Sequence, residues 1–409
     1  MYSDRNMVMV DSLEKICPAL VKELRDEWYR LRYDPSLNGF SENEYVMMHF
    51  EERLREKEES FKETDMADRM DKTAARFRIK QNPELWKKHY ATGFSMLDEV
   101  LSGGFTAGVH YIGAISSLGK STLALQMADS MASKRIPVIY ISLEMPRVDM
   151  AAKLISMYTY LGSQADTRLA KTSSSLVSQK VSENLSDKEW SVVEAAAAKV
   201  EENGKTLTIL ENQINPYTVE DIADYIHTYI HTYLEKPVVF IDYLQILSPP
   251  KGLKGCSDKQ AVDYTVSKLR TISAVYGIPV IVISSFNREN YKTRANFQAF
   301  KDSGNIEYSG DTLIGLQLKG VGDPDFDADK AKARYPREIE MLILKQRNGP
   351  AGCSIKLNYY TRFNYFQQEE WITAPYGTEK IFPKYDGMNE ERQFTMCDYC
   401  EETRTTEVV

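Results

Sequence analysis

Residues 116–122 read Ser-Ser-Leu-Gly-Lys-Ser-Thr, which has the composition and spacing of a phosphate-binding loop. Small residues let the backbone curl so that its N–H groups face an anion, and the N-terminus of a following helix adds positive potential. In such a loop Lys120 would reach the β- and γ-phosphates of a nucleotide and Ser121 would bind Mg²⁺. The usual GxxxxGK[ST] pattern begins with glycine, and here that position is Ala114. A Gly-Lys-Ser triplet also occurs by chance in turns, so this interpretation requires a strand before the loop and a helix after it.

Two acidic residues that end strand-like runs could take part in phosphate chemistry. Asp242 ends the apolar run 238–242, where it would hold the water shell of Mg²⁺; its alternative role is a turn or helix cap. Glu144 follows the run 137–143 and could orient and deprotonate an attacking water; its alternative is a plain surface carboxylate before Pro146. The predicted nucleotide-binding residues are Ala114, Ser117, Gly119, Lys120, Ser121, Thr122 and Asp242.

The elements around these residues predict an α/β fold. From Ala91 onward, short β-branched runs alternate with helical stretches, which implies a mainly parallel sheet flanked by helices. Strands are expected at 109–115, 137–143, 206–210, 238–242 and 279–285, and helices from 120, from 146, near 218–233 and near 258–276. The later part is strand-rich, and its runs at 313–318, 339–345 and 354–360 are expected at the far edge of the sheet, partly antiparallel.

The pattern of predicted strands and helices divides the chain into three regions. Residues 1–88 predict a helical N-terminal extension that packs on the main domain or on a neighbouring subunit, because such helices bury little surface alone. Residues 89–370 form the predicted α/β domain, and residues 371–409 form an acidic C-terminal tail.

Composition excludes several classes of protein. Hydrophobic residues make up 43% and charged residues 27% of the 409, which argues against a disordered chain, a collagen or a disulfide scaffold. We see neither a membrane-spanning apolar run nor a secretory signal, and the five cysteines suit reduced thiols of a cytoplasmic protein. The formal net charge of −8 argues against polyanion binding through bulk charge, although a few loops can bind nucleic acid locally.

Six motifs in order resemble one family over residues 91–366. The segment resembles the C-terminal, RecA-like P-loop NTPase domain of DnaB-type replicative helicases, a family that also tolerates alanine at the first P-loop glycine. The motifs are the lead-in 92–108, the P-loop 114–122, Ser142-Leu143-Glu144-Met145, Asp242-Tyr243-Leu244-Gln245, Ser303-Gly304-x-Ile306-Glu307 and Lys345-Gln346-Arg347-Asn348-Gly349-Pro350.

The resemblance implies a ring helicase, expected to be a hexamer, that hydrolyses ATP with Mg²⁺ between neighbouring subunits. Single-stranded DNA would thread the centre in the 5′ to 3′ direction, and a primase and a loader would be possible partners. Lys345 and Arg347 would act on the neighbour's nucleotide; their alternative is a solvated strand end.

The resemblance also implies two DNA-facing loops. Lys301, Asp302 and Gly304 match the loop that grips the phosphate backbone. Lys251 and Lys254 lie in a Gly- and Pro-containing segment that suits a channel loop, with an ordinary solvated loop as the alternative. Contacts of this kind do not depend on base sequence.

The chain departs from the family at two places. The family commonly has a glutamine that senses the γ-phosphate where this chain has Ser285, which is too short to span the same gap; Asn287 or a water could substitute. The N-terminal segment does not match the family's helical collar, which leaves collar, primase and loader contacts as open questions.

Other motifs and functions compete with this interpretation. His227 and His231 have a metal-binding spacing on one helix face but favour packing or surface roles, and Cys397 and Cys400 form half of a zinc pattern but favour free thiols. The aromatic segment 359–366 favours edge-strand packing beside the nucleotide pocket over base stacking. Two other functions remain open, a RecA- or RadA-like recombination or repair ATPase and a nucleotide-gated, non-catalytic assembly factor.

Overall fold

The structure is a computed structural model, and its chain divides into two units, Met1–Trp86 and Lys87–Val409. It describes residues 18–31, 41–43, 45–50, 52–53, 56, 87–182, 184–211, 217–248, 257–287, 290, 293–300 and 304–375. The predicted boundaries at 88/89 and 370/371 stay predictions. Within the described residues, no helix has both the length and the apolar character needed to cross a membrane.

The described part of the first unit is helical. Helix α2 (Pro18–Leu31) is followed by helical residues at 42–43, 45–50 and 52–53. Two ion pairs, Arg25–Glu42 and Arg53–Glu27, join the segments at the surface. Residues 57–86 of the predicted helical extension lie outside the described residues. Six buried side chains form a small core between the described segments: Leu20, Val21, Leu24, Tyr45, Val46 and Phe50.

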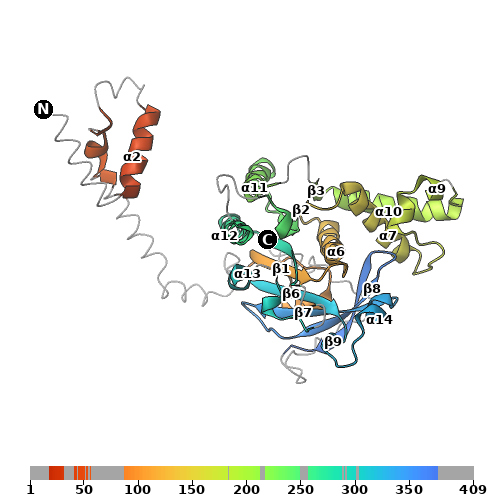
Figure 1. Ribbon diagram of the computed structural model, residues 1–409. Helices are drawn as coiled ribbons and strands as arrows, with labels where there is room; N and C mark the ends of the chain where they lie inside the picture. The colour runs from red at the N-terminus through yellow and green to blue at the C-terminus, as the bar shows by residue number, and fades with distance from the viewer. Residues whose placement is uncertain are drawn as a thin grey trace, which may run out of the picture. The chain divides into compact units, whose positions relative to one another are not determined.

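The second unit is built on a nine-stranded sheet with the order β3-β2-β4-β5-β1-β6-β7-β8-β9 (Figure 1). The strands are β1 (Gly108–Ala114), β2 (Val138–Ser142), β3 (Leu207–Glu211), β4 (Val238–Asp242), β5 (Pro279–Ser285), β6 (Thr312–Leu318), β7 (Arg337–Gln346), β8 (Ser354–Tyr360) and β9 (Tyr365–Thr373). The strands from β3 to β6 in this order pair in parallel, and β7, β8 and β9 extend the sheet antiparallel from β6. The predicted fold class, mainly parallel with an antiparallel far edge, is therefore confirmed.

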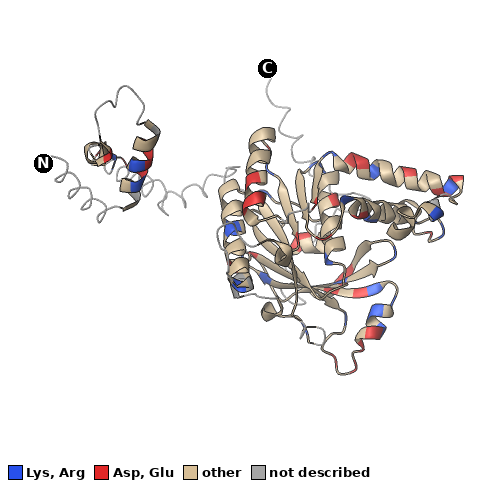
Figure 2. Cartoon of the chain, turned by 45° about the horizontal axis from the view of Figure 1, so that its top comes forward, with Lys and Arg blue, Asp and Glu red and all other residues tan. Residues whose placement is uncertain are grey.

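The central strands are buried on both faces, which explains their continuous apolar sequences. Every residue of β2 and β4 is buried, and six of the seven residues of β5 are buried. Strands of this kind occur where helices cover both faces of a parallel sheet. Figure 2 shows helices on either side of the strands, with most charged residues on helices and loops.

Long helices connect the parallel strands. α6, α7 and α10 pack against one another, and α11 packs against α12. Thr218 and Ser257 begin α11 and α12 with capping boxes that satisfy free backbone N–H groups. The helices are α5 (Ser95–Val100), α6 (Lys120–Ser133), α7 (Arg147–Gly162), α8 (Ser173–Leu176), α9 (Gln179–Ser182), α10 (Asp187–Gly204), α11 (Val219–Tyr233), α12 (Asp258–Tyr276), α13 (Gly304–Ser309) and α14 (Ala328–Ala333), with 3₁₀ turns at Leu244–Ile246 and Phe297–Ala299.

Gly113 in β1 gives a direct test of this packing. A Cβ at Gly113 would lie 2.2 Å from Phe286 Cε1 and 2.5 Å from Phe300 Cε1. We expect Gly113→Ala to lower the free energy of unfolding by about 1–3 kcal/mol, because the rings of a packed core must move. Urea unfolding measures this change.

Gly162→Ala is the matched control, because nothing lies within 4 Å of its added Cβ at the end of α7. It should leave stability unchanged or raise it slightly. Equal destabilisation by both substitutions would contradict the packing described for β1.

Candidate functional site

The loop after β1 leads directly into helix α6 through two residues in the left-handed region. Ser117 has φ +64° and Gly119 has φ +90°, so both residues lie in the left-handed region. Gly119 is the residue that precedes α6, and Leu118 between them is buried. Strand, loop and helix therefore follow one another as the P-loop interpretation requires.

Gly119 is also constrained by two aromatic rings beneath it. Tyr359 and Phe366 stack with their ring centroids 4.0 Å apart. A Cβ at Gly119 would lie 2.9 Å from atoms of both rings. Tyr359 in β8 and Phe366 in β9 thus pack against the backbone of the loop at Gly119, beside the predicted nucleotide pocket.

Lys120 is half-buried and turned toward its own loop. Its Nζ donates hydrogen bonds to the carbonyl oxygens of Ala114 (3.0 Å) and Ile115 (3.2 Å). Burial lowers the pKa of this lysine, while Asp242 and Glu144 favour its charged form. The ammonium group is therefore held at the loop, within electrostatic range of Glu144, the predicted general base, and of Asp242, the predicted Mg²⁺ residue.

Asp242 is 2% exposed at the end of β4. Its Oδ2 accepts a hydrogen bond from the Tyr140 hydroxyl at 3.0 Å, and Ser121 shares a further hydrogen bond with the carboxylate. Burial raises its pKa, whereas the hydrogen bonds and Lys120 oppose that rise. Its Oδ1 is buried without a hydrogen-bond partner. An unpaired carboxylate oxygen beside a serine hydroxyl fits a hard cation such as Mg²⁺, which prefers oxygen ligands.

Glu144 is exposed just beyond the end of β2. Strand β2 pairs with β4, and Ser142 lies opposite Asp242 in that register. The two carboxylates therefore lie at the same edge of the sheet, and Glu144 acts electrostatically on both Asp242 and Lys120. Because Glu144 is exposed and Asp242 is buried, Glu144 is the one of the two that can contact a water molecule from solvent.

Lys345 and Arg347 lie at the opposite edge of the sheet. Residue 114 at the P-loop end of β1 pairs with residue 316 of β6, whereas residue 346 pairs with residue 312 at the other end of β6. The side chains are held there: Lys345 Nζ donates to the Glu307 carbonyl at 2.6 Å, and Arg347 pairs with Asp311 at 2.9 Å. About four strand residues, roughly 13 Å, separate this end from the P-loop end of β1. The structure therefore does not bring these cations to the chain's own P-loop.

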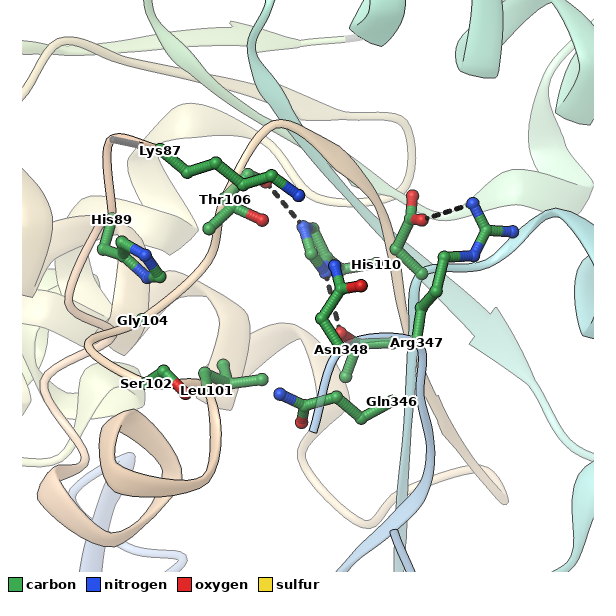
Figure 3. A pocket seen from close by; sticks show the side chains of 12 residues that line it. Lys87, His89, Leu101, Ser102, Gly104, Thr106, His110, Gln346, Arg347 and Asn348 are labelled. Atoms are coloured by element: carbon green, nitrogen blue, oxygen red, sulfur yellow. Dashed lines mark hydrogen bonds and ion pairs between the residues drawn. The ribbon is translucent and has the colours of Figure 1, made fainter. Parts of the chain in front are cut away.

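A pocket of about 160 Å³ opens beside Arg347 at this edge (Figure 3). Figure 3 shows Gln346 and Asn348 on one side of it and His89 on the other. His89 Nδ1 and Gln346 Oε1 are buried there without hydrogen-bond partners. The pocket is distinct from the P-loop and adjoins one of the two predicted trans-acting cations.

The predicted DNA-binding residues are only partly described. Lys251, Lys254, Lys301 and Asp302 lie outside the described residues, and Gly304 begins α13. Cys397 and Cys400 also lie outside them.

Ser285 and the histidine pair are described. Ser285 pairs with Ala114 beside the P-loop. His227 and His231 are exposed on α11, where His227 Nδ1 lies 2.9 Å from the Tyr276 hydroxyl and His231 Nδ1 lies 2.9 Å from a carbonyl oxygen of its own helix. Within the described part of the chain, no group of three or more metal-ligating side chains comes together.

Three polar residues of the site escape sequence reasoning. Tyr140 lies within β2, Lys153 Nζ donates to Thr122 Oγ1 at 3.2 Å, and Arg337 Nη1 donates to the Ser117 carbonyl at 3.0 Å. None of them belongs to a recognisable motif, since each reaches the site through contact with a distant segment. Arg337 is the first residue of β7 and lies before the predicted run 339–345, so no sequence signal marks it.

A parallel sheet with a P-loop and two carboxylates at its carboxyl edge defines a P-loop protein of the RecA-like class. The family model for the DnaB-like helicase C terminal domain matches residues 90–368, so the chain belongs to that family. The resemblance inferred from the six motifs is thereby confirmed.

Curated relatives support the same assignment. The chain is 28% identical over 279 residues to the replicative DNA helicase DnaB of Leifsonia xyli subsp. xyli, covering 66% of this chain and 55% of that protein. It is 25% identical over 282 residues to the replicative DNA helicase DnaB of Haemophilus influenzae, covering 67% and 54%. The chain thus spans about half the length of the curated relatives it matches.

Two solved structures share the fold. One is described as an ATPase domain, with a TM-score of 0.61, 19% identity and coverage of 74% of this chain and 99% of that one. The other is a DnaB-like replicative helicase described with its interactions with primase, with a TM-score of 0.61, 18% identity and coverage of 80% and 73%.

Tyr140→Phe tests the environment of Asp242. Loss of the hydroxyl hydrogen bond raises the pKa of Asp242 further, so its charged form persists only at higher pH. We expect the Mg²⁺ concentration needed for nucleotide binding to rise about tenfold, and to rise more at pH 6 than at pH 8. Titration of nucleotide binding with Mg²⁺ measures this effect.

Tyr111→Phe is the control, because its hydroxyl is also buried in the sheet but lies on β1 away from Asp242. The same Mg²⁺ requirement in wild type and Tyr140→Phe would remove Asp242 from the cation site.

Proposed function

We propose that this chain is the motor of an ATP-driven DNA helicase, which assembles as a hexameric ring, translocates on single-stranded DNA and unwinds duplex during replication. The observation that carries the proposal is the separation of the site into two halves. The P-loop, Glu144 and Asp242 lie at the carboxyl ends of the parallel strands. Lys345 and Arg347 lie at the opposite ends of these strands. Membership of the DnaB-like helicase family supports it.

The half-site at the carboxyl edge supports binding of ATP with Mg²⁺. The N–H groups of the loop and of the first turn of α6 would face the phosphates, and Lys120 would turn from its loop carbonyls toward the β- and γ-phosphates. Ser121 and Asp242 would hold Mg²⁺, which when bound neutralises charge on the phosphates.

Glu144 would be the general base. It is exposed at the same edge as Lys120, so a water between it and the γ-phosphate could give up its proton to this carboxylate. The same transfer step also needs a cation near the γ-phosphate, which raises the rate about 10³–10⁵-fold in related phosphoryl transfers. Lys345 and Arg347 would supply it to the neighbouring subunit, because the sheet keeps them from their own P-loop.

The DNA-facing part of the proposal rests on the residues named from the resemblance. Lys251, Lys254, Lys301 and Asp302, with Gly304 at the start of α13, would line the channel for single-stranded DNA. One structural relative is described with its interactions with primase, so a primase is a proposed partner on that basis; a loader is proposed from the family resemblance alone.

A RadA-like recombination ATPase is the second candidate, favoured by the serine at position 285. Ser285 lies beside Ala114, so a side chain too short to sense the γ-phosphate would weaken the link between hydrolysis and movement. A non-catalytic assembly factor is less well supported. A protein that only binds a nucleotide does not need a water-activating carboxylate, and Glu144 is exposed near Lys120.

Unwinding of a forked DNA duplex with ATP and Mg²⁺ tests the proposal, together with Glu144→Gln. The variant should bind ATP normally and hydrolyse it about 10²–10⁴ times more slowly, because the general base is lost and the binding groups remain. ATPase stimulated by single-stranded DNA without strand displacement would instead support the recombination ATPase. ATP binding without turnover in the wild type would support the assembly factor.

Mixing two inactive variants tests the trans-acting cations. Arg347→Ala should lower ATPase activity by about 10³-fold or more, and Lys120→Ala should abolish nucleotide binding. Mixed rings should recover part of the activity, since some interfaces then combine an intact P-loop with an intact Arg347. No recovery at any ratio of the two variants would show that Arg347 acts within its own subunit.

A further inference from the structure

Lys153 of α7 occupies a position that the P-loop and its carboxylates do not explain. It lies outside the six sequence motifs, yet its Nζ donates a hydrogen bond to Thr122 Oγ1 at 3.2 Å. Thr122 is buried in the first turn of α6, two residues beyond Lys120. The first turn of a helix after a P-loop is where backbone N–H groups meet phosphate oxygens. The ammonium group of Lys153 is therefore one hydrogen bond from the place where the triphosphate would bind.

The surroundings of Lys153 are acidic and converge on the nucleotide site. Asp149 on its own helix, Glu144 after β2 and Asp242 at the end of β4 all favour its charged form. Burial nevertheless lowers its pKa, which shows that the carboxylates only partly offset the loss of solvent. Two of these three carboxylates are the proposed general base and the proposed Mg²⁺ ligand.

The hydrogen bonds of Lys153 are incomplete. An ammonium group carries three donors, and among the described residues Thr122 is its one hydrogen-bond acceptor. The Thr122 hydroxyl also shares a hydrogen bond with Tyr359, which fixes the hydroxyl between the two side chains. The remaining donors of Lys153 have no acceptor among the described residues, so they could bind an anion placed at the start of α6.

We propose that Lys153 is a second phosphate-binding lysine of this subunit, which contacts oxygens of the bound triphosphate from the α7 side. This inference rests on the proposed nucleotide site and adds to it a cation that belongs to neither the P-loop nor the neighbouring subunit. Lys120 approaches the phosphates from the loop, and Lys153 approaches them from the adjacent helix. The negative charge of a triphosphate would then replace the three carboxylates as the main partner of this ammonium group.

Binding of the Mg²⁺ complex of β,γ-imido-ATP, a non-hydrolysable analogue, tests the proposal by calorimetry on the full chain. Lys153→Met should weaken binding at least about tenfold, because a charge-assisted hydrogen bond is lost. Lys153→Gln keeps a donor for Thr122 without the charge and should weaken binding as much, whereas Lys153→Arg should restore most of the affinity. Lys199→Met, which removes an exposed lysine of α10, is the matched control and should bind as the wild type does.

The outcomes separate this inference from the proposed function. If Lys153→Gln folds with an unchanged melting temperature and binds the analogue as tightly as the wild type, Lys153 only ties α7 to α6 and the inference is wrong. A wild type that binds the analogue but fails to unwind DNA contradicts the helicase proposal and leaves the role of Lys153 standing. A wild type that does not bind the analogue overturns both.

Discussion

The electrostatic balance at the carboxyl edge of the sheet underlies the rest of this structure. Burial moves the pKa of Asp242 upward and those of Lys120 and Lys153 downward, so each group is pushed toward its neutral form. These groups stay close enough to offset one another, because isolated buried charges are costly. A magnesium triphosphate carries charges of both signs and could satisfy the carboxylate and the two ammonium groups together. The proposed ligand therefore accounts for buried groups of both charges at one edge, which a simple anion or a lone cation would not.

Parallel pairing is what gathers those groups. Strands β1, β2 and β4 all end at the same edge, so the loop after β1, Glu144 after β2 and Asp242 in β4 meet there although they are far apart in sequence. The same sheet sends β7 in the opposite direction. An antiparallel strand beside a parallel sheet necessarily carries its C-terminal residues to the edge away from the P-loop. The proposed division of the site between two subunits follows from that one change of direction.

The features that the sequence predicts are those with local signals. The apolar runs of β2, β4 and β5 are buried on both faces, and the P-loop and the two carboxylates each follow their own strand directly. Strand β9 is not predicted, because an edge strand with exposed glutamines and glutamates resembles a loop. Helix α10 is not predicted either, although a capping box begins it. Tyr140, Lys153 and Arg337 could not be predicted as site residues, because each acts through a contact that only the folded chain makes.

Strand β7 connects the two halves of the site within one subunit. Near its start Arg337 donates a hydrogen bond to the Ser117 carbonyl of the P-loop, and near its end Lys345 and Arg347 hold the opposite edge. A strand of ten residues spans roughly 33 Å and is stiff, because both of its neighbours hydrogen-bond to it. In the proposed motor, a shift of the P-loop would pull on Arg337 and would be resisted along the paired strand that also carries Lys345. In a ring, that connection would run from a subunit's own nucleotide to the nucleotide of its neighbour, with no need for a separate signalling element.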